Sequence, residues 1–435
     1  MKKIFIFLIG IFLLACLALI ISPGLRTSVS YKLDQLRIYV RYTLFPPQSY
    51  VFVPQQEAQL TVLSASATAT LAASTATASP TPQPSQTPTP TPEPTITPTP
   101  LPKKVLLDDI RYMHQHGLWN YCGPANLAMA LSFWGWKGDR FTTGDYLKPF
   151  REDKSVRAYE MIDYVVNQTD LNVILRYGGT PELLKNLLAN GFTILIEKGI
   201  FLEESLTRRI SWAGHYNVVV GYDDEARQFL TRDSYFSPPD YPLDYPISYD
   251  EILTQWRGFN YVFLVIYPDE RAEQLYQALE SYLDNNTAIQ IATDTSQREA
   301  DALQGLDQFL AIFNLGVNQT LVFDYLSAAA TFDRAFALYA ELPEAQRPHR
   351  VMWYNSAPYF AYYYTARYQD VIDLATTTLE STDKPYLEES WYWRGMALLA
   401  LGDKYGAISD FNTALQYHPG FAPAKEALDQ LSSNP

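Results

Sequence analysis

Cys122 lies in a part of the sequence with globular composition and opens the apolar run CGPANLAMALSFW. Leu127, Leu131 and Trp134 recur at helical spacing, and Pro124 suits the first turn of a helix. Cys122 is therefore predicted at a helix N-terminus, where unpaired N–H groups and the helix dipole favour thiolate over thiol. This is the condition for a nucleophile, although a lone cysteine among apolar residues is also typical of inert packing.

A nucleophilic thiol needs a base, and of the five histidines only His215 begins a predicted strand. The stretch GHYNVVVGYDDEARQFLTRDSYF contains two β-rich runs around a turn at residues 223–226, which predicts a hairpin. Pairing outward from this turn places His215 across from Asp233. Opposed Cβ atoms in such a pair are about 5 Å apart, close enough for a carboxylate to orient an imidazole.

These motifs, with GGTPELLKNLLANGFTILIEKG between them, resemble the papain-like cysteine peptidases related to bacteriocin-leader-processing peptidases. The resemblance covers residues 104–269 and implies an α+β papain-like fold with a helix-opening cysteine and an antiparallel sheet. It implies that Cys122 is the nucleophile, His215 the general acid and base, and Asp233 the residue that orients the imidazole. A peptide or protein is then the expected substrate. The generalised triad arrangement supports the same three roles.

The sequence departs from this family upstream of the cysteine. The family commonly has a Gln six residues before it, as a donor to the oxyanion, whereas here His116 has that position and Gln115 is one residue further away. A one-residue bulge could bring Gln115 into place, His116 could donate instead, or the oxyanion hole could be incomplete. A weak papain-like binding domain in a surface scaffold therefore stays open as an alternative, as does an acyltransferase that uses the same triad.

Other classes of function are disfavoured by composition and motifs. The formal net charge is −14, and no cluster of Lys and Arg is large enough to follow a nucleic-acid backbone. His114 and His116 lack a nearby cysteine or a convincing carboxylate set, so no metal site is expected. The sequence has no ATP-binding motif, and it implies no cofactor.

The N-terminal residues 4–21 form an uncharged apolar run that is just long enough to span a bilayer. We interpret it as an uncleaved membrane anchor, with a cleaved signal peptide and lipidation at Cys16 as alternatives. The Ala, Ser, Thr and Pro content of residues 64–102 predicts an extended stalk, and its Pro-rich half would span about 70 Å. Such stalks resemble those of bacterial surface proteins, so the expected location is the cell membrane, with the folded domains on the extracytoplasmic side.

The C-terminal part has the pattern of continuous helices. LEESWYWRGMALLALGDKYGAISDFNTALQYHP resembles a tetratricopeptide repeat, and two more degenerate copies precede it. The residues at the expected offsets are Trp391, Gly395, Ala407, Phe411, Ala414 and Pro419 in the last copy, Leu315, Gly316, Ala328, Phe332 and Ala335 in the first, and Val371, Ala375 and Thr378 between them. We expect this all-α region to dock a protein partner or substrate in its groove rather than to build the active site.

The sequence thus predicts six segments. They are an anchor or signal at 1–24, a juxtamembrane segment at 25–54, a stalk at 55–103, a papain-like peptidase domain at 104–269, a connecting helical segment at 270–298, and tetratricopeptide-type repeats at 299–435.

Overall fold

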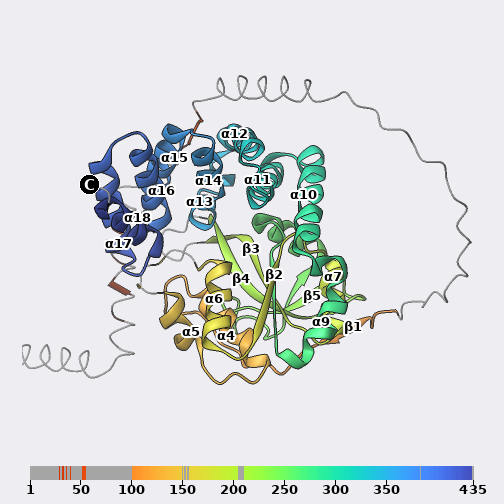
Figure 1. Cartoon of the computed structure of the whole chain (residues 1–435). Helices are drawn as coiled ribbons and strands as arrows, with labels where there is room; N and C mark the ends of the chain where they lie inside the picture. The colour runs from red at the N-terminus through yellow and green to blue at the C-terminus, as the bar shows by residue number, and fades with distance from the viewer. Residues whose placement is uncertain are drawn as a thin grey trace, which may run out of the picture.

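The computed structural model of the chain describes residues 100–148, 150, 153, 156–203, 210–382 and 384–433, with residues 51–54 and the isolated positions 29, 32, 33, 36 and 40. An α+β domain (the sheet domain, residues 104–283) is followed by an all-helical region (the helical region, residues 285–433; Figure 1). The predicted anchor at 4–21 and the stalk residues 55–99 lie outside the described residues. In the part that is described, no helix has both the length and the apolar character needed to cross a membrane.

The sheet domain is built on a single antiparallel sheet, which has seven strands within the described residues. Six strands lie in the order β2-β7-β3-β4-β5-β6. The seventh strand, β1, pairs with the C-terminal end of β4. The strands are β1 (Lys104–Leu106), β2 (Asn172–Arg176), β3 (Ile194–Glu203), β4 (Ile210–Asp223), β5 (Gln228–Arg232), β6 (Tyr245–Ser248) and β7 (Phe263–Tyr267).

Helices cover both faces of this sheet. One cluster of buried residues joins α4 (Cys122–Phe133) and α6 (Ala158–Gln168) to Val218 and Val220 of β4, and α5 (Arg140–Leu147) packs on α4. Val219 points to the opposite face, which carries α7 (Pro181–Ala189), α8 (Tyr249–Trp256) and α9 (Ala272–Leu279). This alternation follows from the two-residue period of a strand and explains the continuous apolar run of β4.

The predicted end of the peptidase domain at residue 269 precedes a further element of the same core. Helix α9 and the short helix η3 (Glu280–Leu283) place Leu275, Leu279 and Tyr282 against the sheet. Residues 272–283 therefore pack with the sheet domain, although the sequence pattern assigns them to a connecting segment.

The helical region is a succession of helices in which consecutive helices pack on one another, from α10 to α12 and from α14 to α18. They form a curved layer beside the sheet domain (Figure 1). Their bounds are α10 (Asn285–Ala302), α11 (Gly305–Leu321), α12 (Tyr325–Glu341), η4 (Glu344–Gln346), α13 (Val351–Tyr354), α14 (Ala357–Tyr364), α15 (Tyr368–Glu380), α16 (Glu388–Ala400), α17 (Lys404–Tyr417) and α18 (Ala422–Ser433).

Two glycines allow neighbouring helices in this region to approach closely. A Cβ atom added to Gly316 would lie 2.7 Å from the ring of Phe332, and one added to Gly395 would lie 2.7 Å from the ring of Phe411. Both phenylalanines are fully buried. The α11–α12 and α16–α17 pairs thus use the same glycine–aromatic contact at the same sequence spacing.

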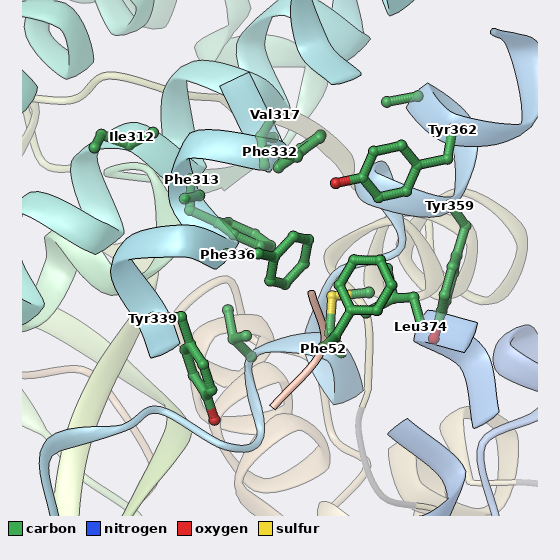
Figure 2. Packing of buried hydrophobic residues seen from close by; sticks show 14 of the residues in the cluster. Phe52, Ile312, Phe313, Val317, Phe332, Phe336, Tyr339, Tyr359, Tyr362 and Leu374 are labelled. Carbon is green, nitrogen blue, oxygen red and sulfur yellow. The ribbon is translucent and has the colours of Figure 1, made fainter. Parts of the chain in front are cut away.

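A short segment from the other end of the chain packs into the helical region. Phe52 is 5% exposed, and its ring lies 5.0 Å from that of Phe336 and 6.0 Å from that of Tyr362. Figure 2 shows the Phe52 side chain among these aromatic residues, beside Leu374. Residues 51–54 (the Phe52 segment) are therefore fixed to the helical region, although they precede the stalk in the sequence.

The sheet domain and the helical region are joined by ion pairs as well as by apolar contacts. Arg257 lies 3.0 Å from Glu299 and 2.9 Å from Asp307, and Arg157 lies 3.2 Å from Glu389. Arg157 and Glu389 are both largely buried, and leaving one buried charge without its partner is costly. These ion pairs thus help to fix the helical region against the sheet domain.

Candidate active site

Helix α4 begins at Cys122, in agreement with the spacing of its apolar residues. Gly123 can have no side chain here, because a Cβ atom would lie 2.8 Å from Val156. Residues 123–131 are buried, so the helix is fixed against the sheet while its first residue stays partly exposed. A rigid helix thus presents the thiol at the edge of the core.

Asn126 connects this helix to the strands that carry the other candidate residues. It is fully buried, and its Nδ2 lies 2.9 Å from the carbonyl of Cys122, 2.7 Å from that of Tyr216 and 2.8 Å from Oγ of Ser234. Asn126 was not among the residues predicted from the sequence. The sequence does mark it, because it is a single amide residue four positions after the cysteine in an otherwise apolar run.

His215 and Asp233 lie together, but the predicted register of the hairpin is wrong. The turn forms at residues 224–227, and a bulge between Val219 and Gly221 shifts the pairing, so the last pair of the β4–β5 ladder is Val218 with Arg232. Asp233 therefore follows the end of β5 rather than standing directly across from His215. Its Oδ1 lies 2.8 Å from Nε2 of His215, and both side chains are buried.

The other nitrogen of the imidazole is left for the thiol. The side chains of Cys122 and His215 are hydrogen-bonded to each other, and because Nε2 is engaged with Asp233, Nδ1 must face the sulfur. Asp233 is itself held by the backbone N–H groups of Tyr235 and Phe236, at 2.8 and 3.1 Å. Cys122, His215 and Asp233 thus form one hydrogen-bonded chain with a fixed third member.

Lys198 is a buried cation that was not predicted as part of the site. Its side chain is 1% exposed, and Nζ lies 3.7 Å from Oδ2 of Asp233, on the opposite side of the carboxylate from His215. Burial lowers the pKa of Lys198, while Asp233 opposes that shift. The signal in the sequence is a Glu-Lys pair inside the apolar strand ILIEKGI, where a charge requires a buried partner.

These contacts shift the pKa values of Cys122, His215 and Asp233 in the directions that favour their charged forms. Burial opposes ionisation of Cys122, yet His215 and the backbone N–H groups of Tyr216 and Gly123 hold the pKa of the thiol below its ordinary value. Burial also disfavours the imidazolium, but Asp233 and then Cys122 raise the pKa of His215 to about 9. Despite its burial, Asp233 has a pKa lowered to about 2, chiefly by His215 and Lys198. The arrangement therefore favours thiolate beside imidazolium.

Glu197 is a second acidic group close to the thiol. It is buried on β3, and its Oε2 accepts a hydrogen bond of 2.8 Å from the hydroxyl of Tyr216. Burial, with a further contribution from Cys122, raises the pKa of Glu197 to about 8, against the hydrogen bond from Tyr216. Near neutral pH Glu197 is largely protonated, so it adds little negative charge to oppose the thiolate.

Gln115 and His116 differ in how their polar atoms are used. Oε1 of Gln115 accepts a hydrogen bond of 2.7 Å from Ser234, and its backbone N–H donates to the carbonyl of the same residue at 2.9 Å. Nε2 of His116 instead lies 2.9 Å from both the carbonyl of Tyr235 and Oγ of Ser237. The hydrogen bond from Ser234 fixes the side-chain carbonyl of Gln115, so the NH₂ group of the same side chain can donate to an oxyanion. In His116, Nε2 already lies within hydrogen-bond distance of Tyr235 and Ser237.

We expect Gln115→Ala to reduce peptide turnover by about 10²–10³-fold, the typical loss when one oxyanion donor is removed. His116→Ala is the matched control and should change turnover little. Alkylation of Cys122 by iodoacetamide should be similar in both variants, because that reaction forms no oxyanion. A larger loss in His116→Ala than in Gln115→Ala would assign the oxyanion donor to His116.

The helical region reaches the strand beside the site, a contact that the sequence does not indicate. The hydroxyl of Tyr354, at the end of α13, accepts a hydrogen bond from the backbone N–H of Gly214, the residue before His215. Burial, and to a smaller extent the charge of Cys122, raises the pKa of Tyr354 to about 12. The helical region thus contacts the strand that carries His215, next to the predicted catalytic residues.

Within the described residues, no group of three or more His, Cys, Asp or Glu side chains is arranged to hold a metal ion. The rings of His114 and His116 stack 5.7 Å apart, and Nδ1 of His114 lies 3.2 Å from a guanidinium nitrogen of Arg140. One ring nitrogen of each histidine thus lies within hydrogen-bond distance of a neighbouring protein group.

Comparison with known proteins agrees with this chemistry. Residues 107–262 match the model of the Peptidase_C39 like family, a stretch that contains Cys122, His215, Asp233 and Gln115. This similarity supports an enzyme of the cysteine peptidase class. No curated protein matches the chain.

Two solved structures are also similar to the chain. A protein from Bacillus anthracis described as a C39-like peptidase is 14% identical, with a TM-score of 0.29, over 38% of this chain and 96% of that one. Xylellain, a cysteine protease from Xylella fastidiosa, is 18% identical, with a TM-score of 0.31, over 39% of this chain and 87% of that one.

Proposed function

We propose, from the similarity of residues 107–262 to C39-like peptidases, that the protein hydrolyses peptide bonds in peptide or protein substrates through Cys122, His215 and Asp233. The observation that carries this proposal is the hydrogen-bonded chain from the thiol through the imidazole to a buried carboxylate. A nucleophile, a base and an orienting group in this order are what covalent acyl transfer requires.

The proposed reaction has two stages. The Cys122 thiolate attacks the carbonyl carbon, and the tetrahedral oxyanion is held by the N–H of Cys122 and the NH₂ group of Gln115. His215 then gives its Nδ1 proton to the leaving amine as the C–N bond breaks, which leaves an acyl-enzyme. The neutral imidazole takes a proton from water as the oxygen of that water attacks the thioester. The C–S bond then breaks, the carboxylic acid leaves, and the thiolate of Cys122 beside the imidazolium of His215 is restored.

The direct test is covalent labelling of Cys122 in the full chain. A peptidyl electrophile should label the wild-type protein with one equivalent at Cys122, and the label should be absent from Cys122→Ser. Peptide hydrolysis should be lost in the labelled protein in proportion to labelling. A wild-type protein that stays folded and takes up no label at Cys122 would refute the proposal.

The proposal extends to the two other parts of the chain. The helical region is a set of tetratricopeptide-type repeats that dock a protein partner or substrate. In support, three of its helices carry buried, mostly small residues at the same spacing: Ala328, Phe332 and Ala335 on α12, Val371, Ala375 and Thr378 on α15, and Ala407, Phe411 and Ala414 on α17. Shared spacing of this kind is typical of repeated helix pairs that stack.

The N-terminal apolar run 4–21 is proposed to anchor the protein in the cell membrane, with the folded domains on the extracytoplasmic side. A tag at the C-terminus should then be accessible to an impermeant reagent in intact cells. A cytoplasmic protein in the same cells is the control and should react only after lysis. Protection of the C-terminal tag until lysis would place both domains in the cytoplasm.

A further inference from the structure

The strand that carries His215 has one edge without a strand partner beside the active site. On one side, β4 pairs with β3 from Ile210 to Val219. On its other side, β5 pairs with β4 only from Val218 onward. Among the described residues, no strand therefore pairs with this second edge between residues 210 and 217. Such an edge is a common place for an extended peptide to bind, since it offers backbone donors and acceptors.

The helical region covers this edge instead. The short helix η4 contacts β4, and Ser211, Trp212 and Ala213 are buried although they have no strand on that side. The cover comes from η4 and α13, which lie between α12 and α14 in the sequence. This part of the helical region thus meets β4 at the edge that leads to His215.

Tyr354 lies at the end of this cover. Its ring centroid is 5.5 Å from that of Phe259 and 6.0 Å from that of Trp212. A Cβ atom added to Gly214 would lie 3.1 Å from the Tyr354 ring, so the ring rests directly on the strand. The hydroxyl accepts the hydrogen bond that the N–H of Gly214 could otherwise give to a bound peptide.

We propose that Tyr354 determines which peptides the enzyme accepts, by closing the free edge of β4 at Gly214 so that a bound chain cannot continue along the strand past this point. The inference rests on the proposed peptidase function. The substrates are then peptides that end, or turn away from the strand, within a few residues of the scissile bond. Long extended chains are excluded because Tyr354 occupies both the space and the backbone donor that they need.

The test compares turnover of two internally quenched peptide libraries by the full chain. Both libraries have the same randomised centre, and in one of them the chain is extended by four residues at each end. Wild-type protein should cleave the short library at least tenfold faster than the long one. Tyr354→Ala should bring this ratio close to one by raising turnover of the long library. Tyr405→Ala, which replaces an exposed tyrosine of the same region, should keep the wild-type ratio.

Tyr354→Phe keeps the ring contacts with Trp212 and Phe259 and removes only the hydroxyl, so it decides the question if the alanine variant does not fold. It should give an intermediate ratio, since the N–H of Gly214 becomes available while the space remains filled. An unchanged ratio in folded Tyr354 variants would overturn the inference and leave the peptidase function intact. Failure of every variant to cleave either library, with Cys122 still labelled by an electrophile, would refute the peptidase function itself and the inference with it.

Discussion

Cys122→Ala is expected to abolish peptide hydrolysis, with a loss of roughly 10⁴–10⁶-fold in turnover, the range found when a catalytic nucleophile is removed. The physical reason is that Cys122, the one cysteine among the described residues, forms the proposed acyl intermediate, and His215 cannot activate water efficiently without that intermediate. The measurement is steady-state turnover of a quenched peptide by wild-type and variant protein at equal concentration.

Folding of the variant is the necessary control. Cys122 is partly exposed and begins α4, so its replacement by alanine removes one sulfur atom at the edge of the core. The melting temperature should therefore stay close to the wild-type value, and His215→Ala should give a comparable loss of turnover. Retention of substantial hydrolysis in a folded Cys122→Ala protein would show that the activity lies elsewhere in the chain.

Asp233→Asn is expected to reduce turnover by about 10²–10⁴-fold, so that a low but measurable activity remains. Its carboxylate orients the imidazole through a 2.8 Å hydrogen bond, and loss of such a group alters the ring's protonation and position without removing the nucleophile. Asp224→Asn, at the turn of the same hairpin, is the matched control and should retain most of the activity.

The pH dependence separates an orienting role from a structural one. In the wild-type protein the thiolate and imidazolium coexist above the lowered pKa of Cys122 and below about 9, where His215 loses its proton. Turnover should therefore fall on the alkaline side near pH 9. Asp233→Asn removes the charge that raises the pKa of His215, so this alkaline limb should move to lower pH. A limb that stays near pH 9 in the variant would contradict the role assigned to Asp233.

The free energy of unfolding should also depend on the ionisation of His215 and Asp233, and the two residues should contribute in opposite directions as the pH rises. The pKa of His215 is raised in the folded state, so its contribution is complete below about pH 6.5 and is lost as the pH rises through about 9. The pKa of Asp233 is lowered, so its contribution is complete above about pH 4 and is lost as the pH falls through about 2. Chemical denaturation across this range should show the alkaline loss at lower pH in Asp233→Asn.

The sequence predicts the parts of the site that depend on local pattern. The start of α4 at Cys122 follows from helical spacing, and the β4–β5 hairpin follows from its turn residues. The register was missed because the bulge between Val219 and Gly221 leaves no pattern of its own in an apolar run. The predicted contact between His215 and Asp233 forms despite this difference in register, because the side chain of Asp233 extends from the end of β5 toward His215.

Contacts between distant segments could not be predicted in this way. Lys198 has a local signal, because a charge inside an apolar strand needs a partner, but the sequence does not say that the partner is Asp233. Tyr354 and Phe52 have none, since both belong to stretches whose aromatic residues equally suit packing within their own segment. Their positions depend on how the helical region is placed against the sheet domain.

Docking of Phe52 on the helical region determines which distances depend on the length of the proline-rich stretch. Residues 55–99 join Pro54, which follows the docked Phe52, to Pro100, which leads into β1, so both ends of this stretch are attached to the folded part of the chain. Doubling the length of such a loop costs only about 0.6 kcal/mol in closure entropy. Burial of a phenylalanine side chain contributes about 1.5–3 kcal/mol, so the docked state should survive that change. With Phe52 docked, insertions within 55–99 therefore lengthen only the connection between Pro54 and Pro100, and the contact between Phe52 and the helical region is kept.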